Sequence, residues 1–170
     1  KIIISDESDE LLETGGGVAK ALSHIDDAPF FVLNGDILWL DGPTATLSQL
    51  VRCWNEREMD GLLLLHSTVE AYGYSGVGDF LVDSDGMLSN RPEQQVSPYV
   101  FTGVQLLHPR LFKNGPHSAF SLNYLYDRSI AEERLFGMIH DGDWFHIGTE
   151  VGLNQAEQYF QQRFPSTRHR

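Results

Sequence analysis

Cysteine and positive charge are both scarce in this sequence. Its 170 residues include one cysteine, Cys53, which excludes an internal disulfide framework and fits a reducing, cytoplasmic compartment. Lysine and arginine together number 12 against 24 aspartates and glutamates, so the formal net charge is −12. A surface this acidic repels nucleic acids and anionic membranes, and neither is expected as a partner.

Long hydrophobic runs are also missing. No apolar stretch approaches the roughly 18 residues that cross a membrane, and no signal peptide is recognisable. Hydrophobic residues still make up 41% of the chain, which is enough for one domain with a core. Because an α/β domain rarely begins inside an apolar strand, Lys1 is expected to be an internal position of a longer chain; processing of a mature protein at this point is the alternative.

Several catalytic signatures are absent as well. The seven histidines show no zinc-ligand spacing, no Gly-Lys-Ser/Thr completes a phosphate loop, and no Gly-x-Ser-x-Gly elbow is present. The chain therefore lacks the common sequence signatures of zinc sites, P-loop NTPases and α/β-hydrolases.

Buried strands and amphipathic helices alternate over the first 65 residues. Strands are expected at Ile2–Ser5, Phe30–Asn34 and Leu62–Leu65, with helices at Val18–His24 and Leu47–Glu56 between them. The continuous apolar run in the second strand is typical of a strand that is covered on both faces. The alternating order predicts an α/β domain with a mainly parallel, Rossmann-like sheet flanked by helices.

The pattern changes after His66. Asp79–Leu88 is expected to form a hairpin that turns at Asp85-Gly86, and Tyr99–Leu107 a strand broken by Gly103; together they make an antiparallel insertion at about residues 67–107. One domain over residues 1–164 and a frayed tail at 165–170 account for the chain. The remaining elements are expected at Pro109–Phe112 (a helical turn), Leu122–Arg134 (a helix), Leu135–His140 and Trp144–Ile147 (strands) and Glu150–Phe164 (a closing helix).

Three consecutive glycines open the first expected helix. Gly15, Gly16 and Gly17 allow the backbone to approach a ligand closely. Free amides in the first turn of a helix favour a phosphate or the acceptor groups of a nucleotide base. A tight loop that binds nothing is the alternative for these glycines.

Asp36 follows the apolar strand, in the segment Asn34-Gly35-Asp36. Ligands of open α/β sheets bind at the carboxyl ends of strands, where a carboxylate suits a Mg²⁺ ion that bridges phosphate oxygens. An aspartate that caps its own turn is the alternative. Taken with the glycines, Asp36 predicts a site for a nucleotide and a metal.

Three further positions are candidates for the site. His146 is a candidate metal or phosphate contact, Arg91 a candidate phosphate clamp, and Gly78 a position where a ligand could approach the backbone. The alternatives are a hydrogen-bonded structural histidine, a solvated arginine and an ordinary turn glycine.

Five segments of the chain, in their order and approximate spacing, resemble a known family of enzymes. They are Glu13–Gly17, Phe31–Asp36, Tyr99–Val104, Leu107–Pro109 and Trp144–Glu150. Their combination resembles the sugar-1-phosphate nucleotidyltransferases, especially the N-acetylmuramate-1-phosphate uridylyltransferases and mannose-1-phosphate guanylyltransferases. The resemblance covers roughly residues 1–160 and implies a nucleotide-diphospho-sugar transferase-like fold without its N-terminal strand–helix units.

The resemblance implies a reaction and its participants. An oxygen of a sugar 1-phosphate attacks the α-phosphorus of a nucleoside triphosphate, and pyrophosphate leaves, with Mg²⁺ or Mn²⁺ stabilising the charge. The roles carried over are nucleotide binding for Glu13, Thr14, Gly15, Gly16, Gly17 and Asn34, sugar binding for Gly78, Thr102 and Gly103, catalysis for Asp36 and Arg91, and metal binding for Asp36 and His146.

Two departures from the family pattern matter. The family's Gly-rich loop, which holds the triphosphate, lies upstream of the strand that corresponds to Ile2–Ser5, so activity is expected of the full-length protein and not of these 170 residues alone. The family also usually has a second metal-binding aspartate where His146 stands. Because Mg²⁺ prefers oxygen ligands, His146 either accepts a metal such as Mn²⁺ or leaves the ion to Asp36.

Two other functions remain open at this point. A non-catalytic relative that binds a sugar nucleotide in a regulatory or scaffolding role would fit the substitution at His146. A phosphatase with Asp36 as its nucleophile would need a second aspartate two residues later, where Leu38 stands. The oligomeric state is left open.

Overall fold

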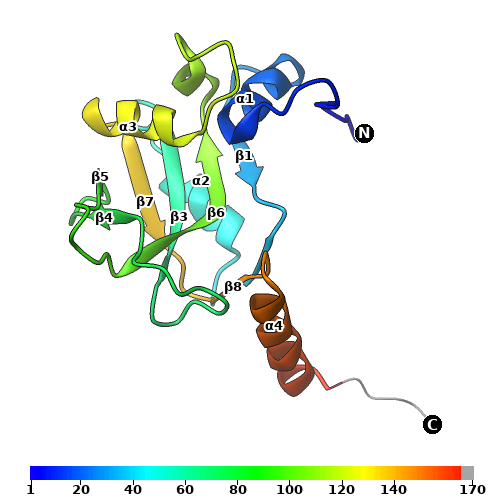
Figure 1. Cartoon of the computed structure of the whole chain (residues 1–170). Helices are drawn as coiled ribbons and strands as arrows, with labels where there is room; N and C mark the ends of the chain where they lie inside the picture. The colour runs from blue at the N-terminus through cyan, green and yellow to red at the C-terminus, as the bar shows by residue number, and fades with distance from the viewer. Residues whose placement is uncertain (166–170) are drawn as a thin grey trace.

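A mixed four-stranded sheet forms the centre of the computed structural model, which describes residues 1–165 (Figure 1). The strand order is β1 (Phe30–Leu33), β6 (Tyr99–Leu107), β3 (Gly61–Ser67), β7 (Leu135–Ile139). Strand β6 runs antiparallel to β1 and β3, while β3 and β7 are parallel. The α/β class agrees with expectation, but the expected parallel pairing is corrected, because β6 lies between β1 and β3 and opposes the other three strands.

Four leucines of β3 divide the interior into two hydrophobic clusters. Leu63 and Leu65 belong to one cluster, whereas Leu62 and Leu64 belong to the other. The alternation follows from the two-residue period of a strand, which points successive side chains to opposite faces. All four are almost completely buried, so the expected buried strand is confirmed.

Helices cover both faces of the sheet. The cluster around Leu63 includes residues of α3 (Asn123–Ala131) and packs against residues of α1 (Glu13–Ala21), while the cluster around Leu62 includes Leu50 of α2 (Thr46–Cys53). The structure also has two short 3₁₀ helices, η1 (Leu22–His24) and η2 (Pro109–Phe112), and Leu111 of η2 belongs to the cluster around Leu63. None of the helices in residues 1–165 is both long and apolar enough to cross a membrane.

Two small sheets flank the central one. The pair β4 (Phe80–Val82) and β5 (Leu88–Asn90) is the expected hairpin, and β2 (Ile37–Leu40) pairs antiparallel with β8 (Asp143–His146). Strand β2 had no counterpart among the sequence-based predictions. Its Ile-Leu-Trp-Leu sequence was the available signal.

Helix α4 (Glu150–Arg163) follows β8 and extends away from the central sheet (Figure 1). Its expected cap is present, because the Thr149 hydroxyl accepts a hydrogen bond from Gly152 N at 3.1 Å. The tail expected to be frayed, 165–170, lies outside the described residues except for Pro165.

One strand prediction was wrong and another holds in part. Ile2–Ser5 forms no strand, because no described segment pairs with it, and the side chains of Ile2 and Ile4 are 93% and 84% exposed. Strand β1 forms as predicted, and its Val32 and Phe31 pack against the clusters on opposite faces of the sheet, but β1 is the edge of the described sheet and Leu33 at its end is 46% exposed. Apolar composition predicts a strand without revealing whether a neighbour covers it.

Candidate functional site

Asp36 and His146 are brought together by the small β2–β8 sheet. Asp36 directly precedes β2, and Ile37 is paired with His146 in the β-ladder. The backbone N–H of Ile147 donates to the carbonyl of Asp36 at 2.9 Å, and Asp36 Oδ2 lies 3.5 Å from His146 Nε2. Both side chains remain accessible, at 53% and 31% exposure, so this pair can meet a ligand.

Gly148 closes one side of this pair. A Cβ atom at Gly148 would lie 2.8 Å from Asp36 Oδ2 and 2.9 Å from His146 Nε2. Any larger residue would therefore displace one of the two polar groups. The glycine after β8 leaves the space that the carboxylate and the imidazole occupy.

Asn34 and Gly103 form a second pair next to Asp36. The Asn34 N–H donates to the Gly103 carbonyl at 2.9 Å, and a Cβ at Gly103 would approach Asn34 Cγ to 2.9 Å. Gly103 has a φ of +82°, which favours glycine for a second reason. Its neighbour Thr102 is fully buried, and the Thr102 hydroxyl donates to the Leu64 carbonyl at 2.8 Å inside the sheet.

The glycine run lies within α1 and not before it. The amides of Gly15 and Gly16 donate to the carbonyl of Phe120 at 2.8 and 3.2 Å, and the Thr14 hydroxyl accepts from Leu122 N at 3.0 Å. The helix begins at Glu13, which has a φ of +58°. The expectation of free amides at Gly15 and Gly16 is therefore corrected, because the segment before α3 takes both.

Gly78 and Arg91 meet at a cavity of about 310 Å³. Arg91 Nε donates to the Gly78 carbonyl at 3.0 Å, and Arg91 Nη1 donates to three carbonyls of residues 92–95. The guanidinium thus holds the loop at this cavity in shape. Gly78 has a φ of +77°, and a Cβ there would lie 2.5 Å from the Ser97 carbonyl oxygen.

Helix α3 supplies residues of the same cavity that the sequence-based reasoning missed. Asn123, Tyr126 and Asp127 line it, and the amide of Asn90 donates to Asp127 Oδ1 at 2.8 Å. Burial raises the pKa of the Tyr126 hydroxyl, which donates to Gln105 Oε1 at 2.5 Å. The four-residue spacing of Asn123 and Asp127 on one helix face was the available signal.

Only some of the predicted residues are arranged along β6, because Glu13–Gly17 contact the segment of Phe120 and Leu122 instead. The Asp36–His146 pair is next to Asn34, which contacts Gly103, and Phe101 two positions earlier in β6 lines the cavity of Gly78 and Arg91. Among residues 1–165, no group of three or more His, Cys, Asp or Glu side chains is arranged to hold a metal. A cation at Asp36 and His146 would need further donors from a ligand or water.

Comparison with protein-family models gives no match. Curated proteins do match. The chain is 35% identical over 157 residues to the N-acetylmuramate alpha-1-phosphate uridylyltransferase of Caulobacter vibrioides, a match that covers 92% of this chain and 65% of that protein. The enzyme of the same name from Neisseria meningitidis is 32% identical over 148 residues, with 86% and 61% covered. The mannose-1-phosphate guanylyltransferase catalytic subunit beta of Drosophila pseudoobscura is 28% identical over 153 residues, with 87% and 39% covered.

Solved structures share the fold. The UDP-glucose pyrophosphorylase of Acinetobacter baumannii superposes with a TM-score of 0.68 at 17% identity, and the match covers 93% of this chain and 59% of that chain. A UDP-glucose pyrophosphorylase complexed with UDP-glucose gives a TM-score of 0.68 at 16% identity, with 91% and 64% covered. The chain spans less than two thirds of the length of these relatives. By sequence it is a homologue of the sugar-1-phosphate nucleotidyltransferases, and it has the mixed-sheet fold of that family.

Proposed function

We propose that the protein carrying this chain transfers a nucleoside monophosphate from a nucleoside triphosphate to a sugar 1-phosphate. A phosphate oxygen of the sugar 1-phosphate forms a bond to the α-phosphorus, the bond from that phosphorus to the bridging oxygen breaks, and pyrophosphate leaves. The products are a nucleotide sugar and pyrophosphate. The proposal includes a cytoplasmic setting, in keeping with a chain whose lone cysteine, Cys53, is free and exposed.

One observation carries the proposal. The accessible Asp36–His146 pair lies beside Asn34 and Gly103 in a chain that is 35% identical to a sugar-phosphate uridylyltransferase. A carboxylate at the end of a strand is where open α/β sheets place their ligand contacts.

The donor pair fits a divalent cation. Asp36 Oδ2 and His146 Nε2 are 3.5 Å apart, and one ion can contact both, because such metal–ligand bonds are about 2.0–2.3 Å long. The imidazole donor suits Mn²⁺ better than Mg²⁺, which prefers oxygen. A cation bound there would neutralise negative charge on the phosphates. The chain's own contribution is to hold the two donors across the β2–β8 ladder.

The cavity at Gly78 and Arg91 is the proposed place for the sugar. Its volume of about 310 Å³ falls at the lower end of small-ligand pockets, which range from about 300 to 1,000 Å³. Arg91 shapes the loop, and the Asn90–Asp127 pair offers polar contacts to hydroxyl groups. Arg91 is therefore proposed to position the sugar phosphate.

The glycine run is proposed to meet the nucleotide. Phe120 takes the amides of Gly15 and Gly16, and its ring fills the space beside Gly15, so the partly exposed Gly17 is the glycine left for close approach of a base. The accessible polar groups nearby belong to Glu13 and Thr14.

An assay of the full-length gene product tests the proposal. Pyrophosphate release is measured with paired panels of nucleoside triphosphates and sugar 1-phosphates, in Mg²⁺ and in Mn²⁺. Asp36→Asn should lower kcat at least a hundredfold with an unchanged thermal midpoint, because Asp36 is exposed; Asp27→Asn, at another exposed aspartate, is the matched control. If the protein binds a nucleotide sugar but releases no pyrophosphate with any combination of triphosphate and sugar 1-phosphate, the result would support the non-catalytic alternative instead.

A further inference from the structure

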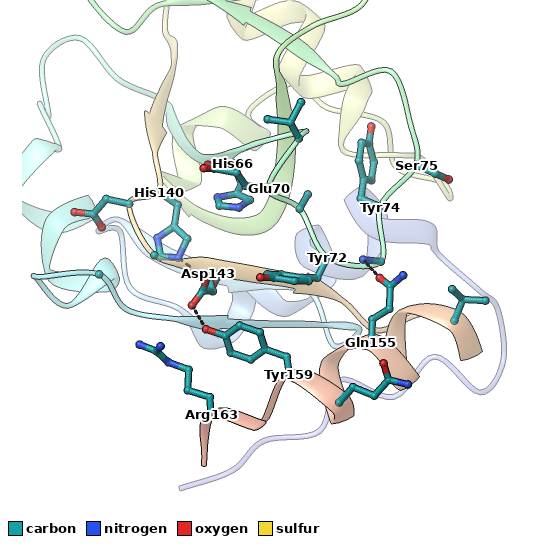
Figure 2. A pocket seen from close by; sticks show the side chains of 18 of the residues that line it. His66, Glu70, Tyr72, Tyr74, Ser75, His140, Asp143, Gln155, Tyr159 and Arg163 are labelled. Atoms are coloured by element: carbon teal, nitrogen blue, oxygen red, sulfur yellow. Dashed lines mark hydrogen bonds between the residues drawn. The ribbon is translucent and has the colours of Figure 1, made fainter. Parts of the chain in front are cut away.

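A second and larger cavity borders the candidate site, since its lining residue Tyr72 accepts a hydrogen bond from the His146 N–H at 2.9 Å. Its volume is about 1540 Å³, and it opens between the loop after β3, the loop that joins β7 to β8, and helix α4 (Figure 2). Neither Asp36 nor His146 lines it. This cleft exceeds the usual range of pockets for one small molecule, about 300–1,000 Å³, so it has room for an extended ligand.

His66 at the end of β3 is a buried polar side chain that faces this cleft with no partner. It is 3% exposed, and neither Nδ1 nor Nε2 has a hydrogen-bond partner among residues 1–165. Buried polar groups are normally paired, and leaving one unpaired is costly because it has lost its hydrogen bonds to water. His66 therefore requires a ligand or water to complete its hydrogen bonds.

The neighbouring His140 does not supply them. His140 Nε2 lies 3.1 Å from the Leu40 carbonyl and 3.3 Å from the Asp143 carbonyl, so this nitrogen must donate. His140 Nδ1 faces the Thr46 hydroxyl at 3.4 Å. The two imidazole rings are 5.7 Å apart, and both nitrogens of His140 are directed elsewhere.

Burial, and to a smaller extent the nearby His140, lower the pKa of His66 below its ordinary value. A neutral imidazole offers one N–H donor and one nitrogen acceptor. A hydroxyl group both donates and accepts, so it can pair with either nitrogen of His66.

The cleft's charges disfavour phosphates. Four carboxylates line it against one guanidinium, that of Arg163. Three of the four already accept hydrogen bonds from the protein: Asp41 from Thr46 N, Asp141 from Gln49, and Asp143 from Tyr159 at 2.5 Å. Part of their acceptor capacity is thus already used, and Glu70 is the fourth carboxylate.

The other walls suit a neutral polar ligand. Tyr72 stacks on Phe145 with ring centroids 4.7 Å apart and also contacts Tyr159, which gives the cleft an aromatic wall. Gln155 accepts from Gly73 N at 2.8 Å through its Oε1 atom, so its amide hydrogens stay available for a ligand. Gln158 and Gln162 of α4 add two more amides, and Figure 2 shows Tyr159 and Gln155 on α4 facing the segment of Tyr72.

We propose that this cleft binds a neutral, hydroxyl-rich ligand of the oligosaccharide class, with His66 pairing with a hydroxyl group at its floor. The unpartnered His66, the aromatic wall and the free amides carry the proposal, and the four carboxylates that line the cleft disfavour phosphorylated sugars. It does not depend on the proposed nucleotidyl transfer.

Nuclear magnetic resonance of the histidine rings in the full chain tests this proposal. The probes are maltotriose and N-acetylglucosamine trimer, with UTP, glucose 1-phosphate and spermidine for comparison. A neutral trisaccharide should shift the His66 ring signals saturably and leave the exposed His24 unchanged. His66→Phe should weaken binding about tenfold, the equivalent of one hydrogen bond, while His66→Gln retains most of it and His24→Phe changes nothing.

The wild-type panel decides the proposal even where a variant fails to fold. The proposal is overturned if no neutral trisaccharide gives a saturable shift at His66 up to about 10 mM. It is equally overturned if UTP, glucose 1-phosphate or spermidine shifts His66 and the trisaccharides do not. An unchanged trisaccharide affinity in a folded His66→Phe variant would also contradict it.

Discussion

Asp36 Oδ2 lies 3.5 Å from His146 Nε2, and the Ile147 N–H to Asp36 carbonyl hydrogen bond joins the two backbones that carry them. The ladder therefore sets the spacing of the donors before any ligand arrives. A ligand that needs one carboxylate oxygen and one imidazole nitrogen meets them without rearrangement of the strands.

Replacing the imidazole tests the cation assignment. His146→Asp in the full-length protein should raise Mg²⁺ affinity about three- to tenfold, because Mg²⁺ prefers oxygen ligands, and should reduce any preference for Mn²⁺. Calorimetric titration with both ions measures the change. His24→Asp, on the exposed η1 helix, adds the same charge elsewhere, and an equal gain there would show a general charge effect.

The space at Gly148 predicts a separation of activity from stability. In Gly148→Ala the new methyl group must push aside Asp36 or His146, so kcat should fall at least tenfold, while the free energy of unfolding changes by less than about 1 kcal/mol because both side chains can rotate. Gly35→Ala is the matched control, since a Cβ there meets no atom within 4 Å. Full activity in Gly148→Ala would show that the Asp36–His146 pair takes no part in the reaction.

The loop around Arg91 should depend on guanidinium geometry. Arg91→Lys keeps the charge but cannot reach the four carbonyls of Gly78, Pro92, Glu93 and Gln95, so amides of residues 92–97 should lose hydrogen-exchange protection. The KM for sugar 1-phosphate should rise more than kcat falls. Arg57→Lys, an exposed arginine, should leave both measurements as they are in the wild type.

The ion pairs of Asp60 predict that the free energy of unfolding decreases at acid pH. Burial alone would raise the pKa of Asp60, but hydrogen bonds from Arg134 and Arg110 bring it below its ordinary value. A lowered folded-state pKa contributes stability above the unfolded value of about 4, and that contribution is lost as the pH falls toward the folded value. Asp60→Asn should cost about 1–3 kcal/mol at pH 7 and much less at pH 3, as urea denaturation at the two pH values would show.

The sequence predicted which segments form elements better than how they pair. Leu62–Leu65 was predicted as a strand because a short continuous apolar run is typical of a buried strand, and all four leucines are buried in the two clusters. Direction is a property of the whole sheet. Nothing local in Tyr99–Leu107 says that it inserts between two parallel strands, and nothing in Ile2–Ser5 says that no described strand lies beside it.

Some residues of the candidate site could be predicted from the sequence, and others depend on contacts between distant segments. The segments of Asp36 and His146 were recognisable by resemblance, and the β2–β8 ladder does bring them together. Asp127 was missed because its relation to Asn90 exists only once α3 packs beside β5. The sequence also gave no sign that the Gly15 and Gly16 amides donate to the Phe120 carbonyl, since Phe120 is about 100 residues away.

The position of β6 between β1 and β3 also has a consequence for synthesis on the ribosome. Strand β1 leaves the exit tunnel about 65 residues before β6, its hydrogen-bonded neighbour in the described sheet. At about 5–20 residues per second, the nascent β1 waits roughly 3–13 s for β6. Pairing of β1 with β6 is therefore paced by translation of the segment from β2 to β5 that separates the two strands.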